Sequence, residues 1–122
     1  AVLAAALLLR CVAGGLPSGY PAVPMRGING SLRMPLVGIG TWQYNDTVAE
    51  AAVSAALRIG YRHVDTAFVY KNQVGVGAAL AQSGLSRDQY FVTSKIPGGL
   101  NASATKAALD KCLEDLKLTS VD

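Results

Sequence analysis

The sequence predicts an α/β fold in which short parallel strands alternate with helices. Two apolar segments, residues 62–67 and 91–96, have the length and composition of buried strands. Helical patterns precede, separate and follow them, at 46–59, at 73–82 and after Asn101. Strands that alternate with helices of this length are typical of a parallel sheet with right-handed crossovers.

The first helix is predicted over Asp46–Ile59. Its apolar residues recur at i, i+3, i+4, i+7 and i+8, a spacing that forms one stripe able to pack on a sheet. The Thr47-x-x-Glu50 pattern predicts a capping box at the start of the helix, and Gly60 predicts its end. The stripe consists of Ala49, Ala52, Val53, Ala56 and Leu57.

The second and third helices are predicted from stripes of the same kind. The second covers Gln73–Gln82, and the third starts at Asn101 or Ser103. Gly75 and Gly77 each weaken the second helix by roughly 1 kcal/mol relative to alanine, so we expect close packing or close backbone approach to compensate at both. The inward-facing residues are Val76, Ala79 and Leu80 in the second helix and Leu109, Cys112, Leu113 and Leu116 in the third.

A β-hairpin is predicted ahead of the parallel sheet. Asn29-Gly30 lies within Met25–Arg33 and is the strongest short hairpin signal. The first strand of the sheet is then expected over Leu36–Ile39. Prolines and a glycine within Pro17–Pro24 predict a linker before the hairpin.

The first residues form an apolar run from Ala1 to Leu9, shorter than the roughly 20 apolar residues that span a membrane. Small residues follow the run, as in a secretory signal or organelle-targeting peptide. A leader without a role is the alternative. We therefore expect residues 1–23 to be a targeting segment with a linker, residues 24–122 to be the folded domain, and no stable membrane span.

The composition is that of a folded chain and narrows the classes of function. Of the 122 residues, 51% are hydrophobic and 16% are charged, which argues against disorder. The net charge of +3 is too small to indicate binding to nucleic acid. Cys11 and Cys112 lie far apart in unlike contexts, so we expect two unpaired thiols. Together with a single histidine they cannot form a zinc site, and no metal is expected.

Three polar side chains are predicted to meet at one edge of the sheet. Asp65 lies near the C-terminal end of the 62–67 strand, and Lys95 lies at the matching end of the 91–96 strand. These ends are neighbours in a parallel sheet, and a buried carboxylate needs a cation. Tyr70 follows in the loop after the first of these strands. Spacing alone favours a simpler reading, an ordinary ion pair with a half-buried tyrosine that anchors its loop.

The segment Tyr61–Ala67 with the following Tyr70-Lys71-Asn72 resembles the G-x-R-H-x-D-T-A…Y-x-N pattern of the aldo-keto reductases. Further segments match in the right order, from about Met25 to the C-terminus; they are Met34–Trp42, Val76-Gly77 and Phe91–Lys95. The resemblance implies a (β/α)₈ TIM barrel preceded by a β-hairpin. Such a barrel needs about 250 residues. This chain begins at Ala1 rather than methionine and ends at Asp122, so we expect an N-terminal part of one.

The resemblance implies a catalytic role for the three side chains at the rim. Tyr70 corresponds to the proton donor of the family, Lys95 to the partner that lowers the pKa of the tyrosine, and Asp65 to the carboxylate that pairs with the lysine. The fourth member of that set, a histidine, falls beyond Asp122. His63 corresponds instead to the histidine inside the motif, and we expect it in the barrel interior.

The resemblance also implies which residues border the ligands. Gly40, Thr41 and Trp42 follow the first strand and would border the nicotinamide and the substrate pocket. Asp65 joins them as a cofactor-binding residue, and Trp42 with Tyr70 would contact the substrate. A glycine at the first of these positions allows the backbone to approach a flat ligand. Simple core packing is the alternative for Trp42.

The implied function is reduction of an aldehyde or ketone to an alcohol with NADPH, by a protein that is a monomer at full length. The choice between NADP and NAD as cofactor remains open, since the loops that bind the cofactor phosphates are expected later in a barrel. One alternative is a non-catalytic, cofactor-binding regulatory subunit of the same fold. Another is an inactive fragment of poor solubility. The family implies the cytoplasm, and a targeting peptide would imply a secretory or organellar site.

The sequence departs from the family pattern at two places that bear on the site. Many members carry glutamate where Gln73 stands, so this chain keeps a hydrogen-bonding side chain and loses a charge. Members more often follow the lysine with a leucine-tryptophan type sequence, whereas Ile96 and Pro97-Gly98-Gly99 follow it here. The second departure changes the expected lining of the substrate pocket.

Overall fold

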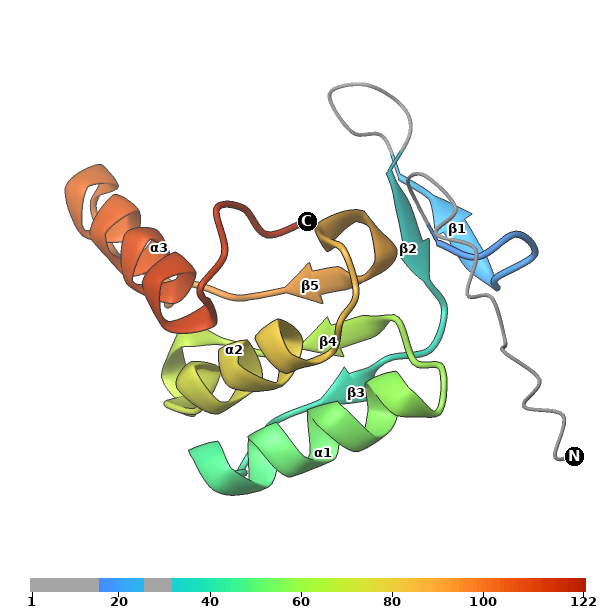
Figure 1. The fold of residues 1–122 in the computed structure, drawn as a ribbon. Coiled ribbons are helices and arrows are strands. Elements are labelled where there is room, and N and C mark those ends of the chain that lie inside the picture. The colour runs from blue at the N-terminus through green and yellow to red at the C-terminus, as the bar shows by residue number, and fades with distance from the viewer. Residues whose placement is uncertain (1–15, 26–31) are drawn as a thin grey trace, which may run out of the picture.

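The computed structural model describes residues 16–25 and 32–122. Three strands form one parallel sheet in the order β3-β4-β5, and a helix follows each strand (Figure 1). This confirms the predicted α/β fold with parallel strands, and the arrangement is the one expected for part of a (β/α)₈ barrel. The elements are β1 (Ala22–Pro24), β2 (Arg33–Pro35), β3 (Ile39–Gly40), α1 (Asp46–Arg58), β4 (His63–Asp65), the 3₁₀ turn η1 (Phe68–Tyr70), α2 (Gln73–Gln82), the 3₁₀ turn η2 (Arg87–Gln89), β5 (Phe91–Thr93) and α3 (Ala102–Leu116).

The register of the sheet aligns the ends of its strands. Gly40 is paired with Asp65, and Asp65 is paired with Thr93. The first strand is two residues long and starts at Ile39, so the prediction of a strand over Leu36–Ile39 was wrong. Leu36 instead continues the hairpin, because its N–H donates to the carbonyl of Pro21 at 3.0 Å.

The hydrophobic core lies between the sheet and the three helices. The predicted stripe of α1 is buried except Ala52, which is only partly buried, and the three inward residues predicted for α2 are all buried. In α3 the predicted Cys112 and Leu116 are buried and Leu113 is partly buried, but Leu109 is 37% exposed and Ala108 is buried in its place. The core residues are Ala49, Val53, Leu57, Val64, Val76, Ala79, Leu80, Tyr90, Val92 and Leu116. Cys112 is buried beside this core as a free thiol, while Cys11 lies outside the described residues.

The two glycines of α2 mark close contacts with neighbouring helices. A Cβ atom at Gly75 would lie 2.0 Å from the carbonyl oxygen of Asp46, at the start of α1. A Cβ at Gly77 would lie 2.6 Å from the carbonyl oxygen of Asp115 in α3. Both distances are far below van der Waals contact, so only glycine fits, and the close packing expected at these positions is confirmed.

The N-terminal ends of α1 and α3 are capped by asparagines. The side chain of Asn45 accepts a hydrogen bond from Val48 N–H at 2.9 Å, and α1 begins after it. The predicted capping box of Thr47 and Glu50 was therefore wrong, and Glu50 accepts a hydrogen bond from Gln82 instead. Asn101 caps α3 through Ala104 N–H, as predicted. Gly60, with a φ of 107°, ends α1 in the conformation that glycine tolerates best.

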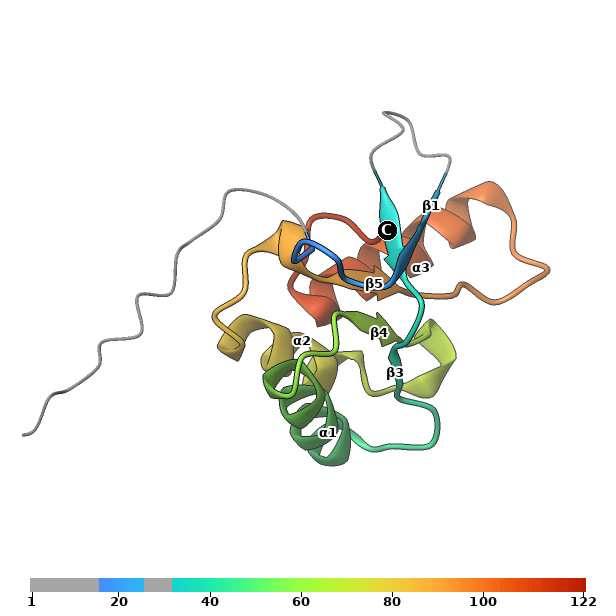
Figure 2. The same ribbon diagram turned by 90° about the vertical axis from the view of Figure 1, so that its right-hand side faces the viewer.

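The N-terminal hairpin lies at the N-terminal ends of the sheet strands (Figures 1 and 2). Strands β1 and β2 pair antiparallel, with Ala22 opposite Pro35. Residues 22–24 are therefore part of the hairpin, and the linker predicted over Pro17–Pro24 was wrong at its end. Tyr20 also joins the fold, since its hydroxyl donates to the carbonyl of Gly60 at 2.9 Å. The Asn29-Gly30 turn and residues 1–15 of the predicted targeting segment lie outside the described residues.

No helix within residues 16–25 and 32–122 is long and apolar enough to cross a membrane.

Candidate active site

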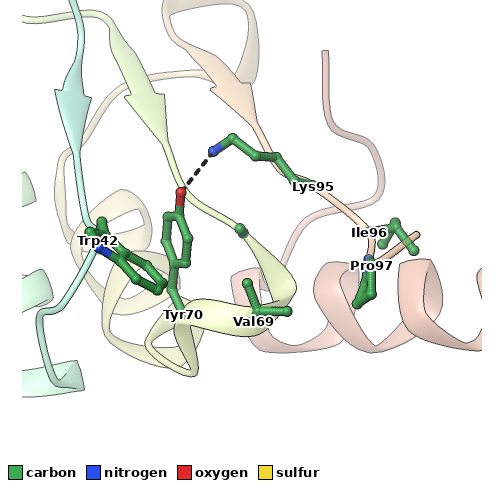
Figure 3. A pocket seen from close by; sticks show the side chains of 7 residues that line it. Trp42, Val69, Tyr70, Lys95, Ile96 and Pro97 are labelled. Carbon is green, nitrogen blue, oxygen red and sulfur yellow. Dashed lines mark hydrogen bonds between the residues drawn. The ribbon is translucent and has the colours of Figure 1, made fainter. Parts of the chain in front are cut away.

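Lys95 is the centre of the cluster at the rim. It follows β5, and its ammonium donates hydrogen bonds to the carboxylate of Asp65, to the phenol oxygen of Tyr70 at 3.2 Å and to the carbonyl of Thr66 at 2.9 Å. Figure 3 shows the lysine reaching toward the phenol across the cavity. The three side chains that the sequence placed at the ends of neighbouring strands therefore meet.

The backbone after β4 and β5 holds this cluster in place. Thr66 N–H donates to the carbonyl of Thr93 at 2.9 Å, and Phe68 N–H donates to the carbonyl of Lys95 at 3.0 Å. These bonds continue the pairing of β4 with β5 past the strand ends. The η1 turn follows at once and ends at Tyr70, so the segment that carries the phenol starts from backbone bonded to the neighbouring strand.

The electrostatic environment keeps Lys95 charged. Partial burial by itself would lower the pKa of the ammonium, but the hydrogen bonds to Asp65 and Tyr70 and the negative charge of Asp65 outweigh it. The pKa of Lys95 is thus raised above its ordinary value of 10.5. The side chains of Lys95 and Asp65 remain 46% and 44% exposed, so the ion pair stays open to solvent.

A cavity of about 490 Å³ opens beside the cluster (Figure 3). The ring of Trp42 packs on Tyr70 with centroids 4.7 Å apart and planes tilted by 60°. Trp42 is 57% exposed, so it is a wall of the cavity and the alternative of simple core packing does not describe it. The lining residues are Trp42, Ala67, Val69, Tyr70, Lys95, Ile96 and Pro97. Apart from the lysine and the tyrosine, this lining is apolar.

The other two residues predicted at the cofactor side occupy different positions. A Cβ atom at Gly40 would meet no atom within 4 Å, so the backbone there is open to a flat ring. Thr41 is fully buried, and its N–H and hydroxyl both donate to the carbonyl of Asp65, at 3.1 and 3.3 Å. Its place is beneath the rim, where it supports Asp65.

His63 lies deeper in the sheet than the cluster. Its Nε2 is 2.9 Å from the hydroxyl of Thr93, and its Nδ1 is 3.3 Å from the carbonyl of Pro35. The ring also packs edge-on against Phe91. The histidine thus joins β4 to β5 and to the hairpin, which agrees with the interior position expected for it.

Two further polar residues surround the site, and sequence reasoning gave neither a functional role. Asn72 is fully buried, and its amide nitrogen donates to the carbonyls of Thr41 and Tyr44 at 2.7 and 2.9 Å. Gln73 is 3% exposed and accepts a hydrogen bond from Ser94, the residue before Lys95, at 2.7 Å. The signal for Asn72 was its place in the Tyr-x-Asn sequence directly after Tyr70.

The chain is similar in sequence to a known family and to several curated proteins. A model described as the aldo/keto reductase family matches residues 36–122. Glycerol 2-dehydrogenase (NADP(+)) of Saccharomyces cerevisiae is 41% identical over 103 residues, which are 84% of this chain and 33% of that protein. Methylglyoxal reductase DkgA of Yersinia pestis is 43% identical over 89 residues, which are 73% of this chain and 32% of that protein.

Solved structures extend the similarity to the fold. A Bombyx mori aldo-keto reductase crystallised in complex with NADP has a TM-score of 0.73 and 30% identity, over 84% of this chain and 36% of that chain. The chain spans about a third of the length of the curated relatives that it matches. The matched family model covers all three βα units of the sheet together with Asp65, Tyr70 and Lys95. The chain therefore belongs to the aldo/keto reductase family.

Proposed function

We propose that a complete barrel carrying this chain reduces an aldehyde or ketone to an alcohol with NADPH. In this proposal Tyr70 is the proton donor, Lys95 stabilises the phenolate, and Asp65 holds the lysine in place. The observation that carries the proposal is the contact of Lys95 with both other side chains at the edge of an apolar cavity. A strand-end ion pair alone would not require a tyrosine at its open side.

The proton step follows from the chemistry of the three groups. The hydroxyl of Tyr70 donates its proton to the carbonyl oxygen of the substrate, and negative charge is left on the phenol oxygen. The ammonium of Lys95, 3.2 Å away, stabilises that charge. Asp65 favours the protonated lysine, so the cation is present at neutral pH. The apolar walls of the cavity strengthen these interactions by limiting water at the reacting oxygen.

The residues present fit a nicotinamide cofactor. The open backbone at Gly40 leaves room for a flat ring. Asp65 is paired with Gly40 in the sheet, and its carboxylate and the indole of Trp42 are both exposed. When bound, NADPH supplies the hydride, which no side chain can donate. NADP in the Bombyx mori structure and in the name of the Saccharomyces relative supports the choice of this dinucleotide.

The names of the relatives support a carbonyl and alcohol pair as substrate and product. One relative is named for oxidation at C2 of glycerol and another for reduction of methylglyoxal. Val69, Ile96 and Pro97 give the cavity an aliphatic wall, which suits the uncharged part of such a substrate.

The test uses a complete barrel that contains this chain, made where necessary by joining it to the remaining two thirds of the Saccharomyces relative. Oxidation of NADPH is followed with an aromatic aldehyde and with methylglyoxal. Tyr70→Phe keeps the ring that packs on Trp42 and removes the proton donor. We expect kcat to fall by about 10²- to 10⁴-fold, the range that general acid catalysis contributes.

Tyr61→Phe is the matched control, since Tyr61 lies before β4 and is not part of the cavity lining. Titration of cofactor fluorescence checks that both variants still bind NADPH. Near-normal turnover in Tyr70→Phe would disprove the proposed proton donor. Cofactor binding without turnover in the unmodified barrel would instead favour the regulatory subunit.

A further inference from the structure

Asn72 joins the two loops that carry the aromatic rings of the site. Its side chain is fully buried, and both amide hydrogens are used by main-chain carbonyls of the loop after β3, at Thr41 and Tyr44. Its amide oxygen lies 3.5 Å from the hydroxyls of Thr41 and Thr66. A buried amide with these partners restrains both loops, because its own donors would be left unsatisfied if the loops moved apart.

The two loops bring Trp42 and Tyr70 together. Trp42 lies between the two residues whose carbonyls accept from Asn72, and Tyr70 lies two residues before it in the chain. The rings of Trp42 and Tyr70 pack at 4.7 Å. The hydrogen bonds of Asn72 therefore connect the two loops that carry these rings.

Each loop also contains a residue in an unusual backbone conformation. Gln43 has a φ of 65° and Lys71 a φ of 56°. Both lie in the left-handed region of backbone conformation that residues other than glycine rarely adopt. Gln43 follows Trp42, and Lys71 separates Tyr70 from Asn72. Such conformations persist only where the surroundings hold them, and the bonds of Asn72 to both sides of Gln43 supply that restraint.

An asparagine is the side chain that this position requires. Two carbonyl oxygens face its nitrogen, so an aspartate of the same shape would place a third oxygen against them. A serine would keep a single donor on a shorter side chain. Neither substitution changes the residues that line the cavity.

We propose that Asn72 is a positioning residue that holds the Trp42 loop against the Tyr70 loop, so that the phenol stays beside Lys95 and the indole closes one side of the cavity. The effect of Asn72 on the reaction rests on the proposed function. The effect of Asn72 on the contact between the rings of Trp42 and Tyr70 does not rest on it, and the two effects can be measured separately.

The test compares Asn72→Asp and Asn72→Ser with Asn101→Asp in the complete barrel. We expect both substitutions of Asn72 to lower kcat by about 10- to 100-fold, since small displacements of reacting groups have effects of this size. The KM for NADPH should change little. The near-ultraviolet circular dichroism of Trp42, taken as the difference from Trp42→Phe, should weaken in both variants. In Asn101→Asp kcat and the Trp42 signal should stay unchanged, because aspartate also caps a helix.

A folded Asn72→Ser barrel with unchanged kcat and an unchanged Trp42 signal would overturn the proposal. If Asn72→Asp does not fold, Asn72→Ser gives the same decision. A weakened Trp42 signal with normal kcat would also overturn it, since the ring contact would then have no effect on the reaction. If the unmodified barrel reduces no carbonyl compound, the proposed function fails, and the Trp42 signal alone decides whether Asn72 joins the loops.

Discussion

Asp65 determines how strongly Lys95 holds its proton. Partial burial alone would lower the pKa of the lysine, and the contact with Asp65 is the main cause that raises it. The folded protein therefore binds this proton more tightly than the unfolded chain does. The resulting stabilisation is complete below the ordinary pKa of 10.5 and is lost as the pH rises through the higher pKa of the folded state.

Replacing the carboxylate should move the alkaline limit of activity. In Asp65→Asn the charge that holds the proton is gone and partial burial dominates, so the pKa of Lys95 falls. Because the proposed reaction needs the ammonium, the alkaline limb of kcat/KM should shift to lower pH than in the unmodified barrel. The measurement is the pH profile of kcat/KM, which reports the pKa values of the essential groups in the free enzyme.

Asp110→Asn provides the control for this experiment. Asp110 pairs with Lys106 at 2.7 Å on the exposed side of α3, far along the chain from the rim. Removing this carboxylate also changes the net charge by one, yet it should leave the alkaline limb in place. An unshifted limb in Asp65→Asn would mean that Lys95 is not the group that titrates with activity.

The sequence predicted best the residues of opposite charge that lie at the ends of neighbouring strands. Asp65 and Lys95 could be placed together because each ends an apolar segment and the ends of parallel strands are adjacent. That Thr41 borders the cofactor stays a prediction, and what the sequence did not indicate is that its buried hydroxyl donates to the main-chain carbonyl of Asp65. The function of Asn72 was not predicted, because its partners are main-chain carbonyls 28 and 31 residues away and main-chain carbonyls leave no pattern in a sequence.

Among the elements, helices were easier to predict than strands. The limits of α2 agree with the prediction, and α1 ends one residue earlier, at Arg58. The strands predicted over 62–67 and 91–96 have only three residues each in the structure. A helix bonds within its own segment, so local pattern defines it, whereas the length of a strand depends on how far its neighbour runs alongside.

The start of α2 shows how a tertiary contact replaces a local cap. Asn72 occupies the N-cap position but its side chain bonds to the other loop, so it does not cap the helix. Asp46 from the start of α1 accepts the hydrogen bond of Gly75 N–H instead, at 2.7 Å. This carboxylate can reach the helix end because Gly75 carries no side chain.

Substituting Gly75 by alanine should therefore destabilise the protein. Alanine favours a helix by roughly 1 kcal/mol over glycine. Its Cβ, however, would lie 2.0 Å from the main-chain oxygen of Asp46, which cannot rotate away. We expect a net loss of about 1–3 kcal/mol, the usual cost of overpacking, as a lower midpoint of urea unfolding in the complete barrel.

Ala81→Gly is the matched substitution on the same helix. Ala81 is exposed, so the change should cost only the propensity difference of roughly 1 kcal/mol. The two variants separate packing from propensity, since they exchange the same two residues in opposite directions. A higher unfolding midpoint for Gly75→Ala would contradict the contact between α1 and α2.

For the molecule as a whole, the sheet has an edge strand, β3, with which no further strand of the described residues pairs. Within residues 16–25 and 32–122, strand β3 pairs only with β4. The other edge is partly occupied, because Asp122 bonds to Val92 through its N–H at 3.0 Å and its carboxylate at 2.8 Å. Arg87 fixes this carboxylate with an ion pair of 2.6 Å. A closed barrel has no free edges, whereas an open sheet edge promotes association.

Exposed apolar side chains lie beside the β3 edge. Leu36 and Val37, directly before β3, are 61% and 58% exposed. We therefore predict that the 122-residue chain alone associates and binds an apolar fluorescent dye, while the complete barrel is monomeric and binds little of the dye.

In the isolated chain, Val37→Lys should reduce association, since a charge beside an edge strand opposes pairing. Ile59→Lys, at the end of α1 where the side chain is 77% exposed, should have a smaller effect. Size-exclusion chromatography with light scattering measures both, and a monomeric, cooperatively unfolding isolated chain would show that the edge does not drive association.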